Sequence, residues 1–164
     1  MIRLLVLDVD GTLSDGMLYF DENGGEMKCF SVKDGLALSS WHKLGHKSAI
    51  ITGRSSKIVE KRARELGIEF LFQGVQDKGA KVREIAERLK LSKEQIAGIG
   101  DDLNDLKMFA EVGMSFAPKD CAKLVANRVD VLLDSCGGKG AVREMIENIL
   151  ERNGELDALL ALWE

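Results

Sequence analysis

Short apolar runs alternate with helix-like segments along most of this chain, and this alternation constrains its fold more than any other feature. Strand-like runs are expected at residues 3–7, 48–51, 70–72, 96–99 and 129–133. Helical patterns are expected between or after them, at residues 36–44, 55–66, 78–89, 103–111 and 121–127. Strands that alternate with helices favour a parallel sheet covered by helices on both faces. The sequence therefore predicts an α/β fold with a doubly wound, Rossmann-like parallel sheet.

One segment near the N-terminus interrupts this alternation. Residues 16–20 and 26–32 are strand-like and flank the stretch DENGG, in which Asn23-Gly24 is a strong hairpin-turn signal. We therefore expect a β-hairpin over about residues 16–32, projecting just after the first strand.

The length of the chain, 164 residues, predicts a single domain over residues 1–164. Near its C-terminus, GGKG at 137–140 predicts a flexible joint before a helix at 141–152. An amphipathic segment follows at 156–163, so the C-terminal helix and tail together span about residues 137–164. This tail is expected to pack on its own domain or on a neighbouring subunit.

The composition excludes several classes of protein. A content of 45% hydrophobic and 30% charged residues is typical of a globular chain, and a net charge of −4 argues against nucleic acid or an anionic membrane as partner. No apolar stretch approaches the roughly 20 residues that span a bilayer, and the start of the chain does not resemble a signal peptide. The three cysteines form no CxxC pair, which favours reduced thiols. We therefore expect a soluble, cytoplasmic protein.

Polar residues gather directly after the apolar runs. The first run is followed by Asp8 and Asp10, the second by Thr52 and Arg54, the third, slightly later, by Lys78 and the fourth by Asp101, Asp102 and Asp105. Ligands of parallel α/β sheets bind beyond the carboxyl ends of the strands, so these side chains are expected to meet at one edge.

The residue types in this group predict phosphoryl transfer. Asp8, Asp10 and Asp101 offer the hard oxygen ligands that Mg²⁺ prefers, whereas Thr52 and Lys78 can donate to phosphate oxygens. Taken singly, each acid is equally typical of a helix N-cap, Thr52 of a turn and Lys78 of an exposed first helical turn. The joint pattern carries the prediction, because independent turns have little reason to place these types on one edge.

Four ordered motifs resemble those of the haloacid dehalogenase-like phosphatases. They are DVDGT from Asp8, ITGR around Thr52, QGVQDKG around Lys78 and GDDLND around Asp101, and the resemblance spans essentially the whole chain. It implies that Asp8 is the nucleophile, that Asp10 is the general acid and then the base, and that Thr52 and Lys78 bind the phosphoryl oxygens. It also implies Mg²⁺ bound by the Asp8 and Asp101 carboxylates and the Asp10 carbonyl. Asp102 and Asp105 are interpreted as supporting or N-cap residues.

The short spacing between motifs resembles the capless group of this family. FSVKDG at 30–35, ITGR, FQGVQDKG and GGKGAVRE at 137–144 resemble its members that act on 3-deoxy-D-manno-octulosonate 8-phosphate in lipopolysaccharide precursor synthesis. The resemblance implies this sugar-acid phosphate as substrate and Arg54 and Arg62 as its ligands, since arginine binds carboxylates in bidentate fashion. It also implies a homotetramer assembled through the hairpins, with the C-terminal tail reaching a neighbouring subunit.

Other functions remain open at this point. Asn104 also resembles phosphatases of a nine-carbon keto-deoxy sugar acid 9-phosphate, although an acidic residue is expected there in place of Arg54. A generalist sugar phosphatase would keep the same four motifs. A receiver-like or regulatory Mg²⁺-binding module is the non-enzymatic alternative. A receiver is disfavoured because the Asp8 and Asp10 pair follows the first strand. A regulatory module is disfavoured because all five motif residues are present, namely Asp8, Asp10, Thr52, Lys78 and Asp101.

Overall fold

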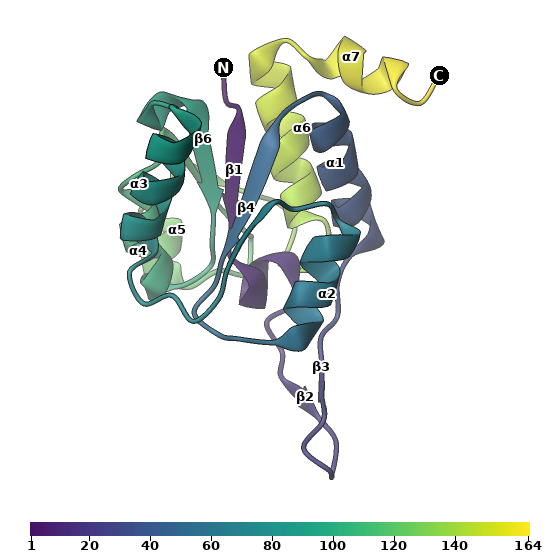
Figure 1. Cartoon of the computed structure of the whole chain (residues 1–164), viewed down its shortest axis with the longest axis vertical. Coiled ribbons are helices and arrows are strands. Elements are labelled where there is room, and N and C mark those ends of the chain that lie inside the picture. Colours follow the sequence, from purple (N-terminus) through teal and green to yellow (C-terminus); the bar gives the residue numbers. More distant parts are fainter.

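The computed structural model describes all 164 residues and is built around a six-stranded, entirely parallel sheet (Figure 1). The strand order is β5-β4-β1-β6-β7-β8. The bounds are Leu4–Leu7 for β1, Lys47–Ile51 for β4, Phe70–Phe72 for β5, Ile96–Ile99 for β6, Met114–Ala117 for β7 and Val131–Leu132 for β8. The chain winds from β1 to β4 and β5, then returns to the other side of β1. This reversal confirms the predicted doubly wound sheet and places a crevice at the carboxyl end of β1.

Helices cover both faces of the sheet (Figure 1). One face is covered by α1 (Val32–Lys43), α2 (Lys57–Glu65) and α6 (Ala141–Asn153). The other is covered by α3 (Lys78–Leu89), α4 (Leu106–Phe109) and α5 (Lys123–Ala126). No helix is long and apolar enough to cross a bilayer.

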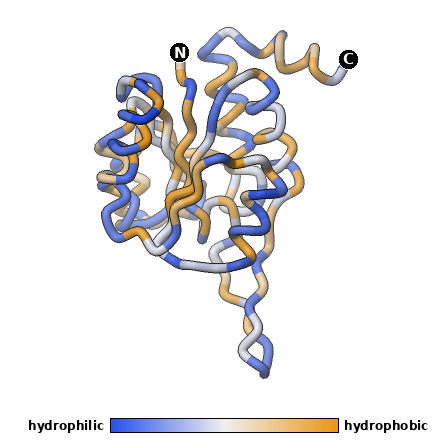
Figure 2. Tube along the Cα trace, in the orientation of Figure 1, coloured by the Kyte–Doolittle hydropathy of each residue, from blue (hydrophilic) through white to orange (hydrophobic).

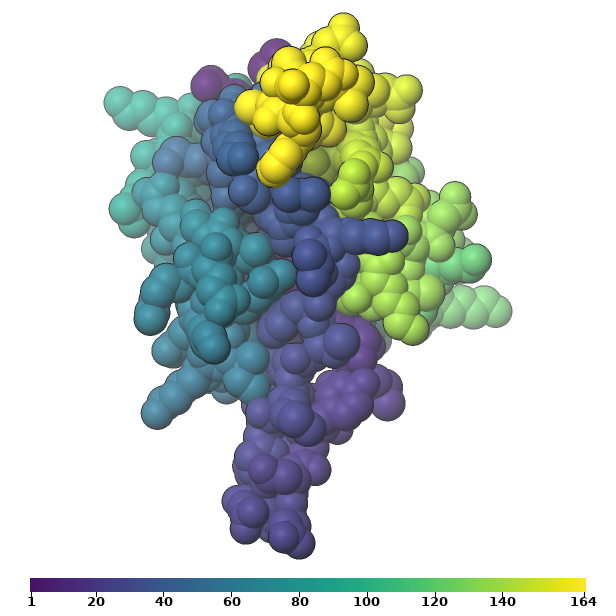
Figure 3. Space-filling view, turned by 90° about the vertical axis from the view of Figure 1, so that its right-hand side faces the viewer, coloured from purple at the N-terminus to yellow at the C-terminus, as the bar shows by residue number.

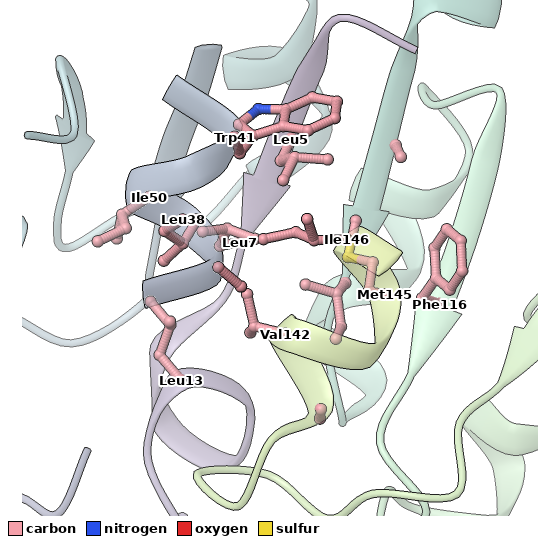
Figure 4. Packing of buried hydrophobic residues seen from close by; sticks show 14 of the residues in the cluster. Leu5, Leu7, Leu13, Leu38, Trp41, Ile50, Phe116, Val142, Met145 and Ile146 are labelled. Atoms are coloured by element: carbon pink, nitrogen blue, oxygen red, sulfur yellow. The ribbon is translucent and has the colours of Figure 1, made fainter. Parts of the chain in front are cut away.

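The central strand β1 separates two hydrophobic cores. Leu5 and Leu7 point to the side of α1 and α6, where they pack in one cluster with Trp41 and Ile146 (Figure 4). Leu4 and Val6 belong to the cluster on the other face of the sheet. Because all four β1 side chains are fully buried, this strand is continuously apolar, and Figure 2 shows the hydrophobic strands running through the middle of the molecule.

The predicted hairpin is present and projects away from the sheet (Figures 1 and 3). Its paired residues, β2 (Tyr19–Phe20) and β3 (Glu26–Met27), are antiparallel. The Asp21 carboxylate closes the turn by accepting hydrogen bonds from the backbone N–H groups of Asn23 and Gly25, both at 2.8 Å. No other structured element lies between β1 and α1 apart from the short turn η1 (Val9–Leu13), so the chain has no cap domain at this point.

The structure differs from the sequence prediction in three elements. The second strand-like run of the hairpin, expected over 26–32, is paired only at Glu26–Met27, and α1 begins at Val32 rather than at residue 36. Strand β7 was not predicted, because its four residues lie between Gly113 and Pro118 and show neither a long apolar run nor alternation. The helix expected over 103–111 is instead a 3-10 turn, η3 (Leu103–Asp105), followed by the short α4. A second 3-10 turn, η2 (Lys93–Gln95), precedes β6.

The C-terminal helix α7 (Leu156–Ala161) packs on its own chain, at the end of the molecule opposite the hairpin (Figures 1 and 3). Trp163 donates a hydrogen bond from Nε1 to the Ser40 hydroxyl of α1 at 3.2 Å, and the Lys43 ammonium lies 4.3 Å from the Trp163 ring centroid. The buried His46 side chain contacts Glu155 at 3.0 Å. No α7 residue is buried, so this segment is a thin layer on the surface of α1 and α6.

Candidate active site

The first acidic motif forms a tight turn immediately after β1. The Asp8 backbone N–H continues the sheet by donating to the Ile99 carbonyl at 3.0 Å, which fixes Asp8 at the strand end. Gly11 then adopts a φ of 92°, in the left-handed region that favours glycine. A Cβ at Gly11 would lie 2.1 Å from the Asp101 carboxylate, so glycine is also required for the close approach of the two acidic loops.

Lys78 joins two buried carboxylates behind this turn. Its ammonium contacts Asp8 Oδ1 at 2.6 Å and Asp105 Oδ1 at 2.5 Å, and all three side chains are almost completely buried. Burial by itself would lower the pKa of Lys78, but the two carboxylates outweigh it and raise that pKa. Lys78 therefore remains a cation, and it binds one oxygen of Asp8 while the second oxygen is left free.

Asp105 completes this arrangement. Its Oδ1 binds Lys78, while its Oδ2 accepts hydrogen bonds from the backbone N–H groups of Asp101 at 2.9 Å and Asp102 at 3.2 Å. Both oxygens are thus used within the protein. Asp105 fixes Lys78 and shapes the loop that carries Asp101.

Asp8, Asp101 and Asp105 place carboxylate oxygens within 4.8 Å of one another. Burial, followed by repulsion from Asp105, raises the pKa of Asp8 to about 6 even though Lys78 opposes this shift. Burial and repulsion from Asp8, Asp105 and Asp102 raise the pKa of Asp101 to about 8. The single Lys78 cation compensates only one of these three carboxylate charges, so the site lacks further positive charge. Because Asp105 is fully engaged, the free oxygens of Asp8 and Asp101 are the ones that fit a hard divalent cation.

A small polar cleft of about 250 Å³ opens over these groups. It has no hydrophobic residue in its lining, which consists of Asp8, Asp10, Gly16, Thr52, Gly53, Arg54, Asp101, Asp102 and Asn104. A volume of this size and polarity suits a charged group such as phosphate rather than an apolar ligand. The structure thus brings five of the seven predicted catalytic, substrate-binding and metal residues to the cleft, and places Lys78 directly behind Asp8.

The two predicted arginines lie in different places. Arg54 lines the cleft, where its Nε lies 3.8 Å from Asp10 Oδ2 and its Nη2 donates to Glu26 Oε1 at 3.3 Å. Arg62 does not line the cleft. Its Nη2 donates to the Ser31 carbonyl at 3.3 Å, and its guanidinium lies 5.6 Å from the Phe30 ring centroid, so it packs against the start of α1.

The Gly137–Gly140 segment is a packed loop, which corrects the prediction of a flexible joint. The Gly138 backbone N–H donates to the Thr12 carbonyl at 2.9 Å. A Cβ at Gly137 would lie only 1.9 Å from the Gly11 carbonyl oxygen, and one at Gly138 would lie 2.5 Å from the Asp15 nitrogen. These glycines allow the loop to support the first acidic motif from behind. The closeness of Gly137 to Gly11 in the folded chain reveals this role, and the local sequence does not.

Comparison with known proteins agrees with this geometry. The family model of the haloacid dehalogenase-like hydrolases matches residues 25–113. The chain is 43% identical to the 3-deoxy-D-manno-octulosonate 8-phosphate phosphatase of Salmonella typhi, an alignment that covers 95% of this chain and 83% of that protein.

Solved structures of such phosphatases are also similar. The Yersinia pestis enzyme has a TM-score of 0.92 and 42% identity, with 95% of this chain and 84% of that chain covered. The Moraxella catarrhalis enzyme, solved in complex with a magnesium ion, a phosphate ion and a KDO molecule, has a TM-score of 0.95 and 40% identity over 99% of this chain and 94% of that chain. The family model and these identities over nearly the whole chain show that the chain belongs to the haloacid dehalogenase-like hydrolase family.

Proposed function

We propose that this chain is a Mg²⁺-dependent phosphomonoesterase that releases phosphate from 3-deoxy-D-manno-octulosonate 8-phosphate. The observation that carries the proposal is the cleft itself, in which Asp8 keeps one carboxylate oxygen free beside Asp101 while Lys78 holds the other. The similarity to phosphatases of this substrate over nearly the whole chain supports the choice of substrate.

The free oxygen of Asp8 attacks phosphorus, and the bond from phosphorus to the sugar oxygen breaks. Asp10 donates its proton to the departing oxygen, which leaves an aspartyl-phosphate on Asp8. A water deprotonated by Asp10 then attacks phosphorus, which releases phosphate and restores both carboxyl groups. Thr52 lines the cleft and Lys78 lies behind it, and we assign both to the phosphoryl oxygens.

Mg²⁺ would be held by the Asp8 and Asp101 carboxylates and the Asp10 backbone carbonyl. When bound, it neutralises the negative charge that gathers between the acids and the phosphoryl group. Arg54 is the residue of the cleft that we assign to the sugar-acid carboxylate. A direct contact of Arg62 with substrate stays a prediction, because in the single chain Arg62 packs against Ser31 and Phe30.

We further propose that residues 1–164 form one phosphatase domain that assembles into a homotetramer through the hairpin. Support for assembly comes from exposed apolar side chains on and beside the hairpin, namely Met17, Leu18, Tyr19, Phe20 and Met27. The contact of the C-terminal tail with a neighbouring subunit stays a prediction, since α7 packs on its own α1. Three free cysteines are in keeping with a cytoplasmic enzyme.

Phosphate release from the eight-carbon and nine-carbon sugar-acid phosphates, with and without Mg²⁺, tests the proposal. We expect strong preference for the eight-carbon substrate and loss of activity in EDTA. Greater activity on the nine-carbon compound would keep the phosphatase and overturn the substrate. Broad, unselective hydrolysis would indicate a generalist enzyme, and no release from a folded, Mg²⁺-loaded protein would refute the phosphatase itself.

A further inference from the structure

A lysine from the hairpin is buried against the acidic motif. Lys28 follows β3, and its ammonium donates to Asp10 Oδ1 and lies 3.1 Å from Glu26 Oε1. The Lys28 side chain is only 1% exposed, whereas the Asp10 and Glu26 side chains are about one-fifth exposed. Lysine is almost never buried to this degree without a specific partner.

Lys28 belongs to a closed set of four charges, which we call the hairpin ion-pair network (Asp10, Glu26, Lys28 and Arg54). Lys28 contacts both Asp10 and Glu26, and Arg54 lies near the same two carboxylates, with its Nε 3.8 Å from Asp10 Oδ2 and its Nη2 3.3 Å from Glu26 Oε1. The network joins the hairpin to the cleft at Asp10, a motif acid that Lys78 does not contact.

The two oxygens of Asp10 are therefore in different environments. Oδ1 accepts a hydrogen bond from Lys28, whereas Oδ2 accepts none from the protein and belongs to a residue that lines the cleft. A carboxyl group that transfers a proton must keep one oxygen within hydrogen-bond reach of the reacting atom. Fixing Oδ1 determines where Oδ2 lies.

We propose that Lys28 is a positioning residue for the reaction, holding Asp10 so that its Oδ2 faces the leaving-group oxygen of the substrate. This inference rests on the proposed phosphatase activity and adds to it a residue of the hairpin. The alternative is that Lys28 only anchors the hairpin to the domain.

The test compares kcat/KM for two esters, because this parameter reports the step in which the leaving group departs. The alkyl ester is the proposed substrate, 3-deoxy-D-manno-octulosonate 8-phosphate, whose leaving oxygen needs a proton. The other ester is p-nitrophenyl phosphate, whose p-nitrophenolate departs without one. We expect Lys28→Met to lower kcat/KM about 100-fold for the alkyl ester and less than about 10-fold for p-nitrophenyl phosphate. Lys33→Met, which removes an exposed lysine of α1, is the matched control and should leave both values unchanged.

A double-mutant cycle sharpens the test. If Lys28 acts through Asp10, Lys28→Met should have almost no further effect on the alkyl ester in an Asp10→Asn background. Equal losses on both esters, additive losses in the cycle, or no loss at all would overturn the proposal. If Lys28→Met does not fold, the same test is applied to Lys28→Gln, which keeps a donor of similar reach. The expected loss of kcat/KM for the alkyl ester is then smaller. Hydrolysis of neither ester by the wild type would count against the phosphatase itself, not against the role of Lys28 alone.

Discussion

The acidic cleft and the hairpin are neighbours with opposite construction. In the cleft, buried charges are paired or tightly grouped. Glycines allow close packing of the three loops that contain Gly11, Asp101 and Gly137. In the hairpin, a short ladder carries apolar side chains that nothing covers, and Phe20 is 60% exposed. The difference indicates that the cleft takes its shape within one chain, whereas the hairpin is built to meet another surface.

Removing the nucleophile should produce the largest effect. Asp8→Asn keeps the size of the side chain but removes the attacking oxygen, so we expect turnover to fall by about 10⁴-fold or more. Phosphate release at saturating substrate measures this, and circular dichroism checks that the fold is intact. Substantial residual activity would show that another group accepts the phosphoryl.

Gly137→Ala tests whether close backbone packing shapes the cleft. Its Cβ would lie 1.9 Å from the Gly11 carbonyl oxygen, so we expect a loss of about 1–3 kcal/mol in the free energy of unfolding, together with reduced activity. Gly24→Ala in the hairpin turn is the counterpart. It meets no atom within 4 Å but has a φ of 82°, so it should cost roughly 1 kcal/mol without affecting the cleft. Urea denaturation measures the loss of stability in both variants, and activity assays show whether Gly137→Ala alone affects the cleft.

The dependence of Mg²⁺ binding on pH follows from the raised carboxylate pKa values. A carboxyl whose folded pKa lies above its usual value of 3.8 stabilises the folded state below that value, and this stability is lost as the pH rises toward about 6 for Asp8 and about 8 for Asp101. Mg²⁺ displaces these protons, so its apparent Kd should be larger at pH 6 than at pH 8 by roughly tenfold or more, which means weaker binding at pH 6.

Thermal unfolding with and without Mg²⁺ at the two pH values measures this. The rise in Tm caused by Mg²⁺ should be larger at pH 8, and Asp101→Asn should abolish the difference. An equal rise at both pH values would place the cation elsewhere.

A charge on the hairpin should affect assembly and little else. Phe20→Asp replaces an exposed apolar side chain, so the stability of the isolated subunit should change by no more than about 0.5 kcal/mol. Assembly through the hairpin should be lost, which light scattering after size-exclusion chromatography detects. An unchanged oligomer would mean that the hairpins do not form the interface.

The smallest effect is expected at the C-terminal tail. Trp163 is about half exposed and is held by one hydrogen bond and the Lys43 cation–π contact, so Trp163→Ala should cost about 1 kcal/mol. Chemical denaturation measures the loss. A loss of activity with unchanged stability would instead favour a contact of the tail with a neighbouring subunit.

The sequence by itself determined the parallel α/β fold, the hairpin, the strand ends that carry Asp8, Thr52 and Asp101, and the start of the helix that carries Lys78. Local periodicity and the rule that parallel strands share a carboxyl edge are sufficient for that. Strand β7 was missed because four residues give too little pattern.

Only the tertiary structure decided which charges pair. Lys78 meets Asp8 across 70 residues of sequence and Asp105 across 27, and Lys28 meets Asp10 across 18. Nothing in the sequence around Lys28 distinguishes it from exposed lysines such as Lys33, and the place of Lys78 after the third strand does not show which carboxylates it meets. The roles of Asp105 and Gly137 likewise depend on which loops lie within a few ångströms of each other. The role of a buried charged residue or of a glycine depends on the neighbours that the fold brings close to it, and the local sequence does not show these neighbours.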